Sequence, residues 1–451
     1  MQAPASAARD VTALAILALL AGGGGAAYGL VNLAIQLAAL LVLAMNGRAV
    51  AAFFTSAPRP LVALCAASLA LPLVQLVPLP PAVWSALPGR DLVSASLRAA
   101  TPGAAGSAGW FHWTVDSART TVAFAGLLAP FTVIAVGWGL HRRDLARLAW
   151  MVVALGMVDL VVGAVQVVSD AGVPYPENPM PGVLFGTFAN RNSTGLLLDC
   201  AIVLLSVLPA GALAKGGRLA IGAMLALGVV LTQSRSAMAL LVAVVVFAGL
   251  SNVVLGNNGN APTQLRPKRV AAIAAGIVVA AAGLGAMSQA AGLFEGTRIE
   301  TSLARFHGAA SHPRAAIWED GAFVARRYWP VGVGMGNFDD VFQIDESLET
   351  LKPRVAGRAH NDYLEIAIEA GAFGLALVAS WMAFLLLAVW KARFSIERRM
   401  AWTGAAVLGA IAAQSLLDYP LRNQTMLCVA AIAVLLLLRM GATPRNKSGP
   451  T

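Results

Sequence analysis

The sequence predicts an all-helical protein that crosses a membrane many times. Of its 451 residues, 58% are hydrophobic and 12% are charged, whereas a soluble domain carries roughly 25% charged residues. The apolar residues come in blocks of about twenty, the length of helix that crosses ~30 Å of hydrocarbon at 1.5 Å per residue. So few charges leave too little polar surface for a water-soluble globule, and the blocks favour one membrane domain.

About twelve apolar blocks are predicted to span the membrane. They lie near residues 11–27, 29–46, 61–79, 120–139, 148–168, 193–210, 218–233, 236–254, 270–288, 362–390, 401–418 and 424–439. A run of glycines at 22–25 and Tyr28 separate the first two. The first block resembles a signal peptide, but further spans follow at once, so we expect a retained helix.

The loop charges predict the orientation. With the N-terminus inside, the short inner segments hold 18 of the 32 Lys and Arg residues, as the positive-inside rule requires. Both termini are then cytoplasmic, and we expect a bacterial inner membrane. The net charge of +10 reflects this topology and anionic headgroups rather than nucleic acid.

Two outer segments are long, about 80–119 and 289–361. The second lies between the ninth and tenth spans and is the largest polar stretch of the chain. It contains a predicted helix near 313–328 and then a glycine-rich stretch, Gly332–Gly336, which favours a tight turn because it has no P-loop lysine.

Several outer arginines break the positive-inside bias. Arg191, preceded by Asn190, opens the sixth span, and Arg235 stands between the seventh and eighth. A guanidinium at the lipid boundary is costly unless it is paired, and its planar fork suits phosphate. We expect these arginines to bind a pyrophosphate; the alternative is snorkelling or structural ion pairing.

A histidine stands where the long outer loop enters the tenth span. His360 lies at the predicted helix start, and Asn361, Glu365 and Glu369 follow on one helix face. Two carboxylates entering a span need a polar cavity or a partner, for which Arg191 and Arg235 are candidates. A neutral imidazole at a helix N-terminus can accept a proton; the alternative for His360 is an N-cap or surface residue.

Other polar residues carry weaker signals. Asp339 and Asp340 do not form an Asp-x-Asp metal motif, and His307 and His312 lack metal-ligand spacing, so we expect no metal and no cofactor. Asp159 and Asp199 lie in or near spans and are either structural or cavity-lining. The three cysteines fall in apolar blocks and are interpreted as small buried side chains.

Four motifs together resemble the O-antigen ligase and polymerase family, which includes bacterial protein O-oligosaccharyltransferases. They are residues 188–192 (Phe-Ala-Asn-Arg-Asn), 234–236 (Ser-Arg-Ser), 330–338 (Pro-Val-Gly-Val-Gly-Met-Gly-Asn-Phe) and 360–365 (His-Asn-Asp-Tyr-Leu-Glu) with Glu369 and Gly371. Their order, spacing and shared outer location carry the resemblance, which runs over about 180–380. The expected organisation is N-terminal spans at 1–180, a ligase-like core at 181–380, and last spans with a cytoplasmic tail at 381–451.

The resemblance implies a function. Family members pass a glycan from undecaprenyl pyrophosphate to an acceptor in the periplasm, such as lipid A-core or a growing glycan, without metal and with inversion. By similarity, His360 accepts the acceptor's proton, Arg191 and Arg235 hold the pyrophosphate, and Asn190, Asn361, Glu365 and Glu369 support them. Arginines can supply the charge that stabilises the leaving pyrophosphate, where Mg²⁺ often does so elsewhere.

The residues leave alternatives open. Ligase, polymerase and protein glycosyltransferase differ only in the acceptor. A lipid-linked glycan flippase is a different class, but transporters of that kind often show internal repeats, and none is seen. A scaffold protein would leave the polar face that follows His360 unexplained.

Overall fold

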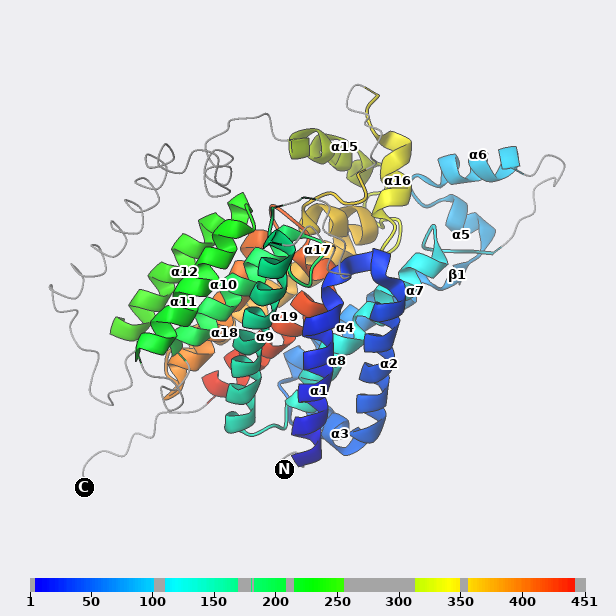
Figure 1. The fold of residues 1–451 in the computed structure, drawn as a ribbon. Coiled ribbons are helices and arrows are strands. Elements are labelled where there is room, and N and C mark those ends of the chain that lie inside the picture. Colours follow the sequence, from blue (N-terminus) through cyan, green and yellow to red (C-terminus); the bar gives the residue numbers. More distant parts are fainter. Residues whose placement is uncertain are drawn as a thin grey trace.

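The computed structural model describes residues 5–100, 110–168, 180, 182–207, 215–254, 313–348 and 356–442. These residues form a mostly helical bundle (Figure 1). Within these described ranges, four helices are long and apolar enough to cross a membrane, or up to five if a pair bent by 79° is one span. Every predicted span except 270–288, which lies outside the described residues, overlaps a helix. The chain is therefore a helical membrane protein, and the count of twelve spans stays a prediction.

The N-terminal helices pack as a hairpin with a bent continuation. They are α1 (Ala5–Ala21), η1 (Gly22–Tyr28), α2 (Gly29–Met45), α3 (Gly47–Ser56) and α4 (Arg59–Gln75). The bend between α2 and α3 occurs at Asn46, whose side-chain amide donates to buried Asp10 of α1 at 3.0 Å. This bond ties the start of α1 to the bend.

The middle and C-terminal helices complete the bundle. They are α7 (Ser117–Gly126), α8 (Leu128–Gly137), α9 (Arg142–Val168), α10 (Arg191–Val207), α11 (Lys215–Leu231), α12 (Arg235–Val254), α17 (Asp362–Ala392), α18 (Arg398–Gln414), η4 (Pro420–Arg422), α19 (Gln424–Leu435) and η5 (Leu436–Met440). α10 packs against α9, α11, α12 and α18, so nearly its whole length is buried.

The two long outer segments supply small elements that gather at one end of the bundle, opposite the start of α1 (Figure 1). These elements are β1 (Pro78–Leu79), α5 (Pro81–Ser85), α6 (Arg90–Ala100), β2 (Phe111–His112), α15 (Pro313–Arg327) and α16 (Phe338–Asp345). β1 and β2 pair antiparallel, with Pro78 opposite His112. α15 confirms the helix predicted near 313–328, and residues 101–109, 289–312 and 349–355 of these segments lie outside the described part.

Contacts between the two segments are polar and buried. The fully buried Arg90 donates from Nη2 to the Trp113 carbonyl at 2.5 Å and to the Gly332 carbonyl at 3.4 Å. Burial lowers the pKa of Arg90 to about 10. The Val115 amide donates to the Val333 carbonyl at 2.9 Å. Gly332–Gly336 is a turn, as predicted, and it is held between the first outer segment and α17.

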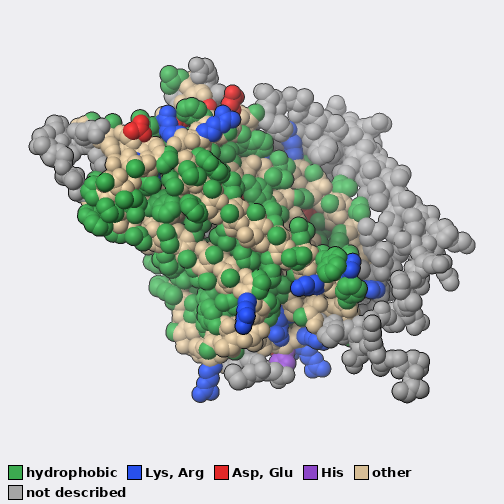
Figure 2. Space-filling model, turned by 180° about the vertical axis from the view of Figure 1, so that it is seen from behind, with side chains coloured by type: hydrophobic (Ala, Val, Ile, Leu, Met, Phe, Trp, Pro, Cys, Tyr) green, Lys and Arg blue, Asp and Glu red, His purple; other side chains and the backbone are tan. Residues whose placement is uncertain are grey.

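The charges follow the same polarity along the bundle. Seen from behind, apolar side chains cover the middle, the lower edge carries Lys and Arg, and the upper edge carries both signs of charge (Figure 2). This pattern agrees with basic inner loops, although the side of the membrane on which each end lies stays a prediction. The three cysteines are buried, as expected from their apolar blocks.

Candidate functional site

His360 and Asp418 form a hydrogen-bonded pair. His360 Nδ1 lies 2.8 Å from Asp418 Oδ1, and the other oxygen of Asp418 accepts from Asn190 Nδ2 at 2.7 Å. The Asp418 side chain is completely buried, while that of His360 is 33% exposed, so the imidazole remains accessible. Because an ionised carboxylate only accepts hydrogen bonds, Nδ1 is the donor, and Nε2 carries the lone pair of a neutral ring.

The backbone around His360 fixes this pair. His360 has a φ of 50°, a left-handed conformation that is uncommon outside glycine. The next residue, Asn361, is the N-cap of α17, and its side chain accepts from the Leu364 amide at 3.1 Å. The Asp362 amide donates to the carbonyls of Ser415 and Asp418 at 2.9 and 3.2 Å. The start of α17 is thus joined to the end of α18.

An aromatic ring lies beside the imidazole of this pair. The Tyr419 ring lies 5.1 Å from the imidazole of His360, centroid to centroid. Burial, and then the charge of Asp418, raise the pKa of Tyr419 above its ordinary value. Tyr419 is therefore a neutral ring that packs beside the imidazole, at an interplanar angle of 56°.

A buried arginine forms ion pairs with the three carboxylates that follow His360. Arg422 Nη1 lies 2.7 Å from Glu369 Oε2, and its Nε lies 3.2 Å from Glu365 Oε2 and 3.4 Å from Asp362 Oδ1. Burial alone would lower the pKa of Arg422, but the three carboxylates raise it above its ordinary value. Glu365 also accepts from Arg358 at 3.3 Å.

This arrangement corrects one expectation from the sequence. Glu365 and Glu369 do share one face, but their partners are Arg422 and Arg358 rather than Arg191 and Arg235. The correct partner lies more than fifty residues further along the chain, so helix periodicity could not reveal it. The two glutamates, with Asp362, therefore fix Arg422 beneath the His360 loop.

Arg191 and Arg235 occupy equivalent places on two neighbouring helices. Arg191 is the first residue of α10, and Arg235, which is exposed, is the first residue of α12. Helix N-termini present unsatisfied N–H groups and a positive partial charge, which favour an anion. The first residues of two packed helices thus bring two guanidinium groups and two such termini to one end of the bundle.

Neutral side chains join these helix ends to α18. Ser234 Oγ donates to Asn192 Oδ1 at 2.7 Å, and Ser234 and Ser236 hydroxyls lie 3.2 Å apart. Gln414 of α18 donates to Ser236 Oγ at 2.9 Å. The neighbouring Asn190 thus connects Arg191 with the His360–Asp418 pair, and the neighbouring Ser236 connects Arg235 with α18.

A buried latch on α9 holds the turn that carries Asn190 and Arg191. Asp159 Oδ1 accepts from the Thr187 amide at 2.5 Å and from the Thr187 hydroxyl at 2.8 Å. Gln166 accepts from the Gly186 amide and donates to its carbonyl, both at 2.9 Å. A side chain at Gly23 of η1 would meet the Thr187 carbonyl at 2.5 Å, so the glycine run allows η1 to support the same turn.

The latch gives Asp159 the structural role that the sequence left open. Asp199, in contrast, is fully buried in α10, and neither of its oxygens has a hydrogen-bond partner among the described residues. We assign it no role. Asp339 and Asp340 pair with Arg119 at 2.7 and 2.8 Å and hold α16 against α7.

The sequence analysis did not single out Asp418, Tyr419 and Arg422. A signal was present, because Asp418 ends one predicted span and Tyr419 and Arg422 lie in the short link to the next, on the predicted outer side, where Arg422 breaks the positive-inside bias. Other candidates, including His307 and His312, lie outside the described residues. Among residues that the structure describes, no group of three or more His, Cys, Asp or Glu side chains is placed to hold a metal ion.

Comparison with known proteins supports the resemblance drawn from the motifs. Residues 220–379 match the family model described as O-antigen ligase. The matched segment includes Arg235, His360, Glu365 and Glu369, but not Asn190, Arg191, Asp418 or Arg422. The resemblance to the O-antigen ligase family is confirmed over this segment, and a comparison with curated proteins finds no significant match.

Proposed function

We propose that this membrane protein, similar over residues 220–379 to O-antigen ligases, transfers a glycan from undecaprenyl pyrophosphate to an acceptor at the periplasmic face of the inner membrane. Glycan transfer of the ligase or polymerase type follows in general from the family match. The carrier, the acceptor, the side of the membrane and the residues below are our proposal.

The observation that carries the proposal is the pairing of the partly exposed His360 with the buried Asp418. In the proposed step, Nε2 of His360 takes the proton of the acceptor hydroxyl while the acceptor oxygen bonds to the anomeric carbon. The Asp418 carboxylate stabilises the imidazolium that forms, as the aspartate of a Ser-His-Asp triad does. Asn190 keeps Asp418 oriented through its 2.7 Å bond.

The leaving group departs on the opposite side of the sugar. The bond from the anomeric carbon to the pyrophosphate oxygen breaks, and the carrier pyrophosphate keeps the electron pair. Arg191 and Arg235, at the N-termini of α10 and α12, stabilise that growing charge. A single displacement inverts the anomeric centre, and the proton on His360 is released to solvent. No metal takes part in this scheme.

Glu365, Glu369 and Asn361 support the reaction indirectly. Asn361 caps α17 directly after His360, and the two glutamates hold Arg422 under the loop. We infer that they position the imidazole and do not touch the substrate. Polymerase and protein O-oligosaccharyltransferase activity remain variants of the same chemistry with another acceptor.

Deleting the gene tests the proposal. We expect lipid A-core without attached polymer, with polymer accumulating on its carrier, and restoration by a plasmid copy. Core that carries a single repeat unit would instead identify a polymerase. Unchanged lipopolysaccharide and exopolysaccharide, together with no transfer by the purified protein from a lipid-linked donor, would overturn the proposal.

A further inference from the structure

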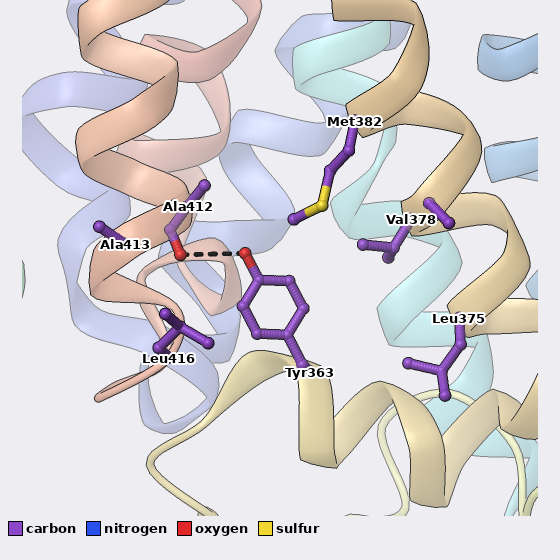
Figure 3. Close-up of a pocket in the computed structure, with 8 residues that line it drawn as sticks. Tyr363, Leu375, Val378, Met382, Ala412, Ala413 and Leu416 are labelled. Atoms are coloured by element: carbon purple, nitrogen blue, oxygen red, sulfur yellow. Dashed lines mark hydrogen bonds between the residues drawn. The ribbon is translucent and has the colours of Figure 1, made fainter. Parts of the chain in front are cut away.

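An open apolar groove of about 470 Å³ runs between α17 and α18. Its walls include Val378 and Met382 of α17, Ala412 of α18, and Leu416 just after α18 (Figure 3). Tyr363 closes one end, and its hydroxyl donates to the Ala412 carbonyl at 2.9 Å. Because the one polar atom of Tyr363 is bonded to the backbone, the groove presents an almost wholly apolar lining.

The groove arises from a break in α17. Gly371 has a φ of 55°, and a side chain there would meet the Pro330 carbonyl oxygen at 2.0 Å. Figure 3 shows the part of α17 that bears Tyr363 lying across the end of the groove, whereas Leu375, Val378 and Met382 face α18 along its length. From Leu375 to Met382 this wall is about 10 Å long at 1.5 Å per residue.

The closed end of the groove adjoins the candidate site. Tyr363 follows His360 by three residues on one wall, and Leu416 precedes Asp418 by two on the other. Next to Tyr363, the Asp362 amide donates to the carbonyls of Ser415 and Asp418, which follow α18 on either side of Leu416. A molecule with its hydrocarbon chain in the groove would therefore place its polar end next to the imidazole.

The groove lies on one side of α18 and the arginine-bearing helices contact another. Ala412 and Leu416 line the groove, whereas the intervening Gln414 is buried and donates to Ser236 of α12. In the proposed function His360 acts on the acceptor, while Arg191 and Arg235 bind the donor pyrophosphate. The groove is thus on the acceptor's side of the site.

We propose that this groove binds a hydrocarbon chain of a lipid-anchored acceptor, an inference that rests on the proposed function. Leu416 is 53% and Met382 38% exposed, so the groove is open to bilayer chains. Arg314 donates to the carbonyl of Leu417, the residue directly after the groove-lining Leu416, and offers a cation to a phosphorylated headgroup near the closed end. Such an acceptor favours a ligase acting on a glycolipid over a protein glycosyltransferase.

Two matched substitutions on α17 test the groove by kinetics. Ala379 lines the groove and Ala376 does not, and both are exposed. With lipid A-core as acceptor, we expect Ala379→Trp to raise KM for the acceptor about tenfold, the effect of losing roughly two buried methylenes. The KM for the donor and for de-acylated acceptor should not change, and Ala376→Trp should behave as wild type. Equal effects of both substitutions would overturn the proposal.

Photo-crosslinking identifies the molecule bound in the groove without requiring glycan transfer. Benzoylphenylalanine is placed at position 379 or 376, and the protein is reconstituted with phosphatidylglycerol alone or with added lipid A-core or undecaprenyl phosphate. A lipid A-core adduct enriched at 379 supports the proposal. An undecaprenyl adduct, an equal yield of phosphatidylglycerol adduct at both positions, or an adduct with a peptide from 270–288 overturns it. If the wild type transfers no glycan but the lipid A-core adduct still forms at position 379, the proposed function is wrong and the assignment of the groove's ligand is kept.

Discussion

The two halves of the candidate site are built from different chemistry. In the carboxylate half, at the start of α17 and the end of α18, Asp418 holds His360, and Asp362, Glu365 and Glu369 hold Arg422. In the amide half, at the starts of α10 and α12, the bonds run through Asn192, Ser234, Ser236 and Gln414.

The difference separates two tasks. Buried charges must be paired, and breaking such a pair is strongly destabilising, so the carboxylate half is rigid and holds a base in place. Neutral amides and hydroxyls fix the starts of α10 and α12, and these helix ends carry Arg191 and Arg235, which in the proposed function bind the donor pyrophosphate. Breaking the buried ion pairs of the first half should therefore affect both folding and chemistry, whereas replacing the exposed Arg235 of the second should affect activity far more than folding.

The largest effect is expected at the imidazole. His360→Ala removes the proposed proton acceptor and should lower the transfer rate by about 10²–10⁴-fold, measured as initial rate with purified protein at equal concentration. His141→Ala, an exposed histidine at the opposite end of the bundle, is the control and should keep the wild-type rate. Full activity of the His360→Ala protein would show that the carboxylate half takes no part in the chemistry.

Arg422 gives the sharpest test of the contrast in stability. Arg422→Met leaves three buried carboxylates without their shared cation and should lower the free energy of unfolding by about 3–5 kcal/mol. The exposed Arg235→Met should change it by less than ~0.5 kcal/mol. Denaturant unfolding in detergent measures both. Equal losses would show that the two halves do not differ as argued.

The arginines of the amide half should affect the donor. Arg191→Gln or Arg235→Gln should lower kcat/KM for the lipid-linked donor by roughly 10–100-fold, since hydrogen bonds to charged groups contribute about 1.5–3 kcal/mol. Arg→Lys keeps the charge but loses the fork and should restore part of the activity. Donor kinetics that no substitution alters would place the pyrophosphate elsewhere.

A smaller effect is expected at the latch on α9. Asp159→Leu leaves the Thr187 amide and hydroxyl without an acceptor and should lower stability by about 1–3 kcal/mol. It should also raise KM for the donor, because the turn carries Arg191. Asp159→Asn retains an acceptor and should recover most of both. If the leucine variant loses stability but keeps its donor KM, the latch is structural only.

Removing divalent cations should have no effect. Because arginines supply the positive charge in the proposed reaction, transfer after EDTA treatment should equal that of the untreated protein. Loss of activity that Mg²⁺ restores would contradict the metal-free scheme and would require another partner for the pyrophosphate.

Much of the site could be predicted because its residues mark helix ends. A polar residue at the boundary of an apolar block is visible in the sequence, and this gave Asn190, Arg191, Arg235 and His360. The partners could not be predicted in the same way. Asp418 and Arg422 lie 58 and 62 residues after His360, and no local pattern relates them to it.

By itself, the sequence determined that the chain is a helical membrane protein with polar residues at the ends of apolar helices, because hydrocarbon accepts only long apolar helices whose backbone bonds are internal. It also determined that Glu365 and Glu369 share a face, since helix geometry is local. Only the tertiary structure decided that this face meets Arg422, that Asp418 meets His360, and that the break at Gly371 opens a groove beside them. Which helices pack together depends on side-chain fit between distant segments, and helical periodicity holds no information about that choice.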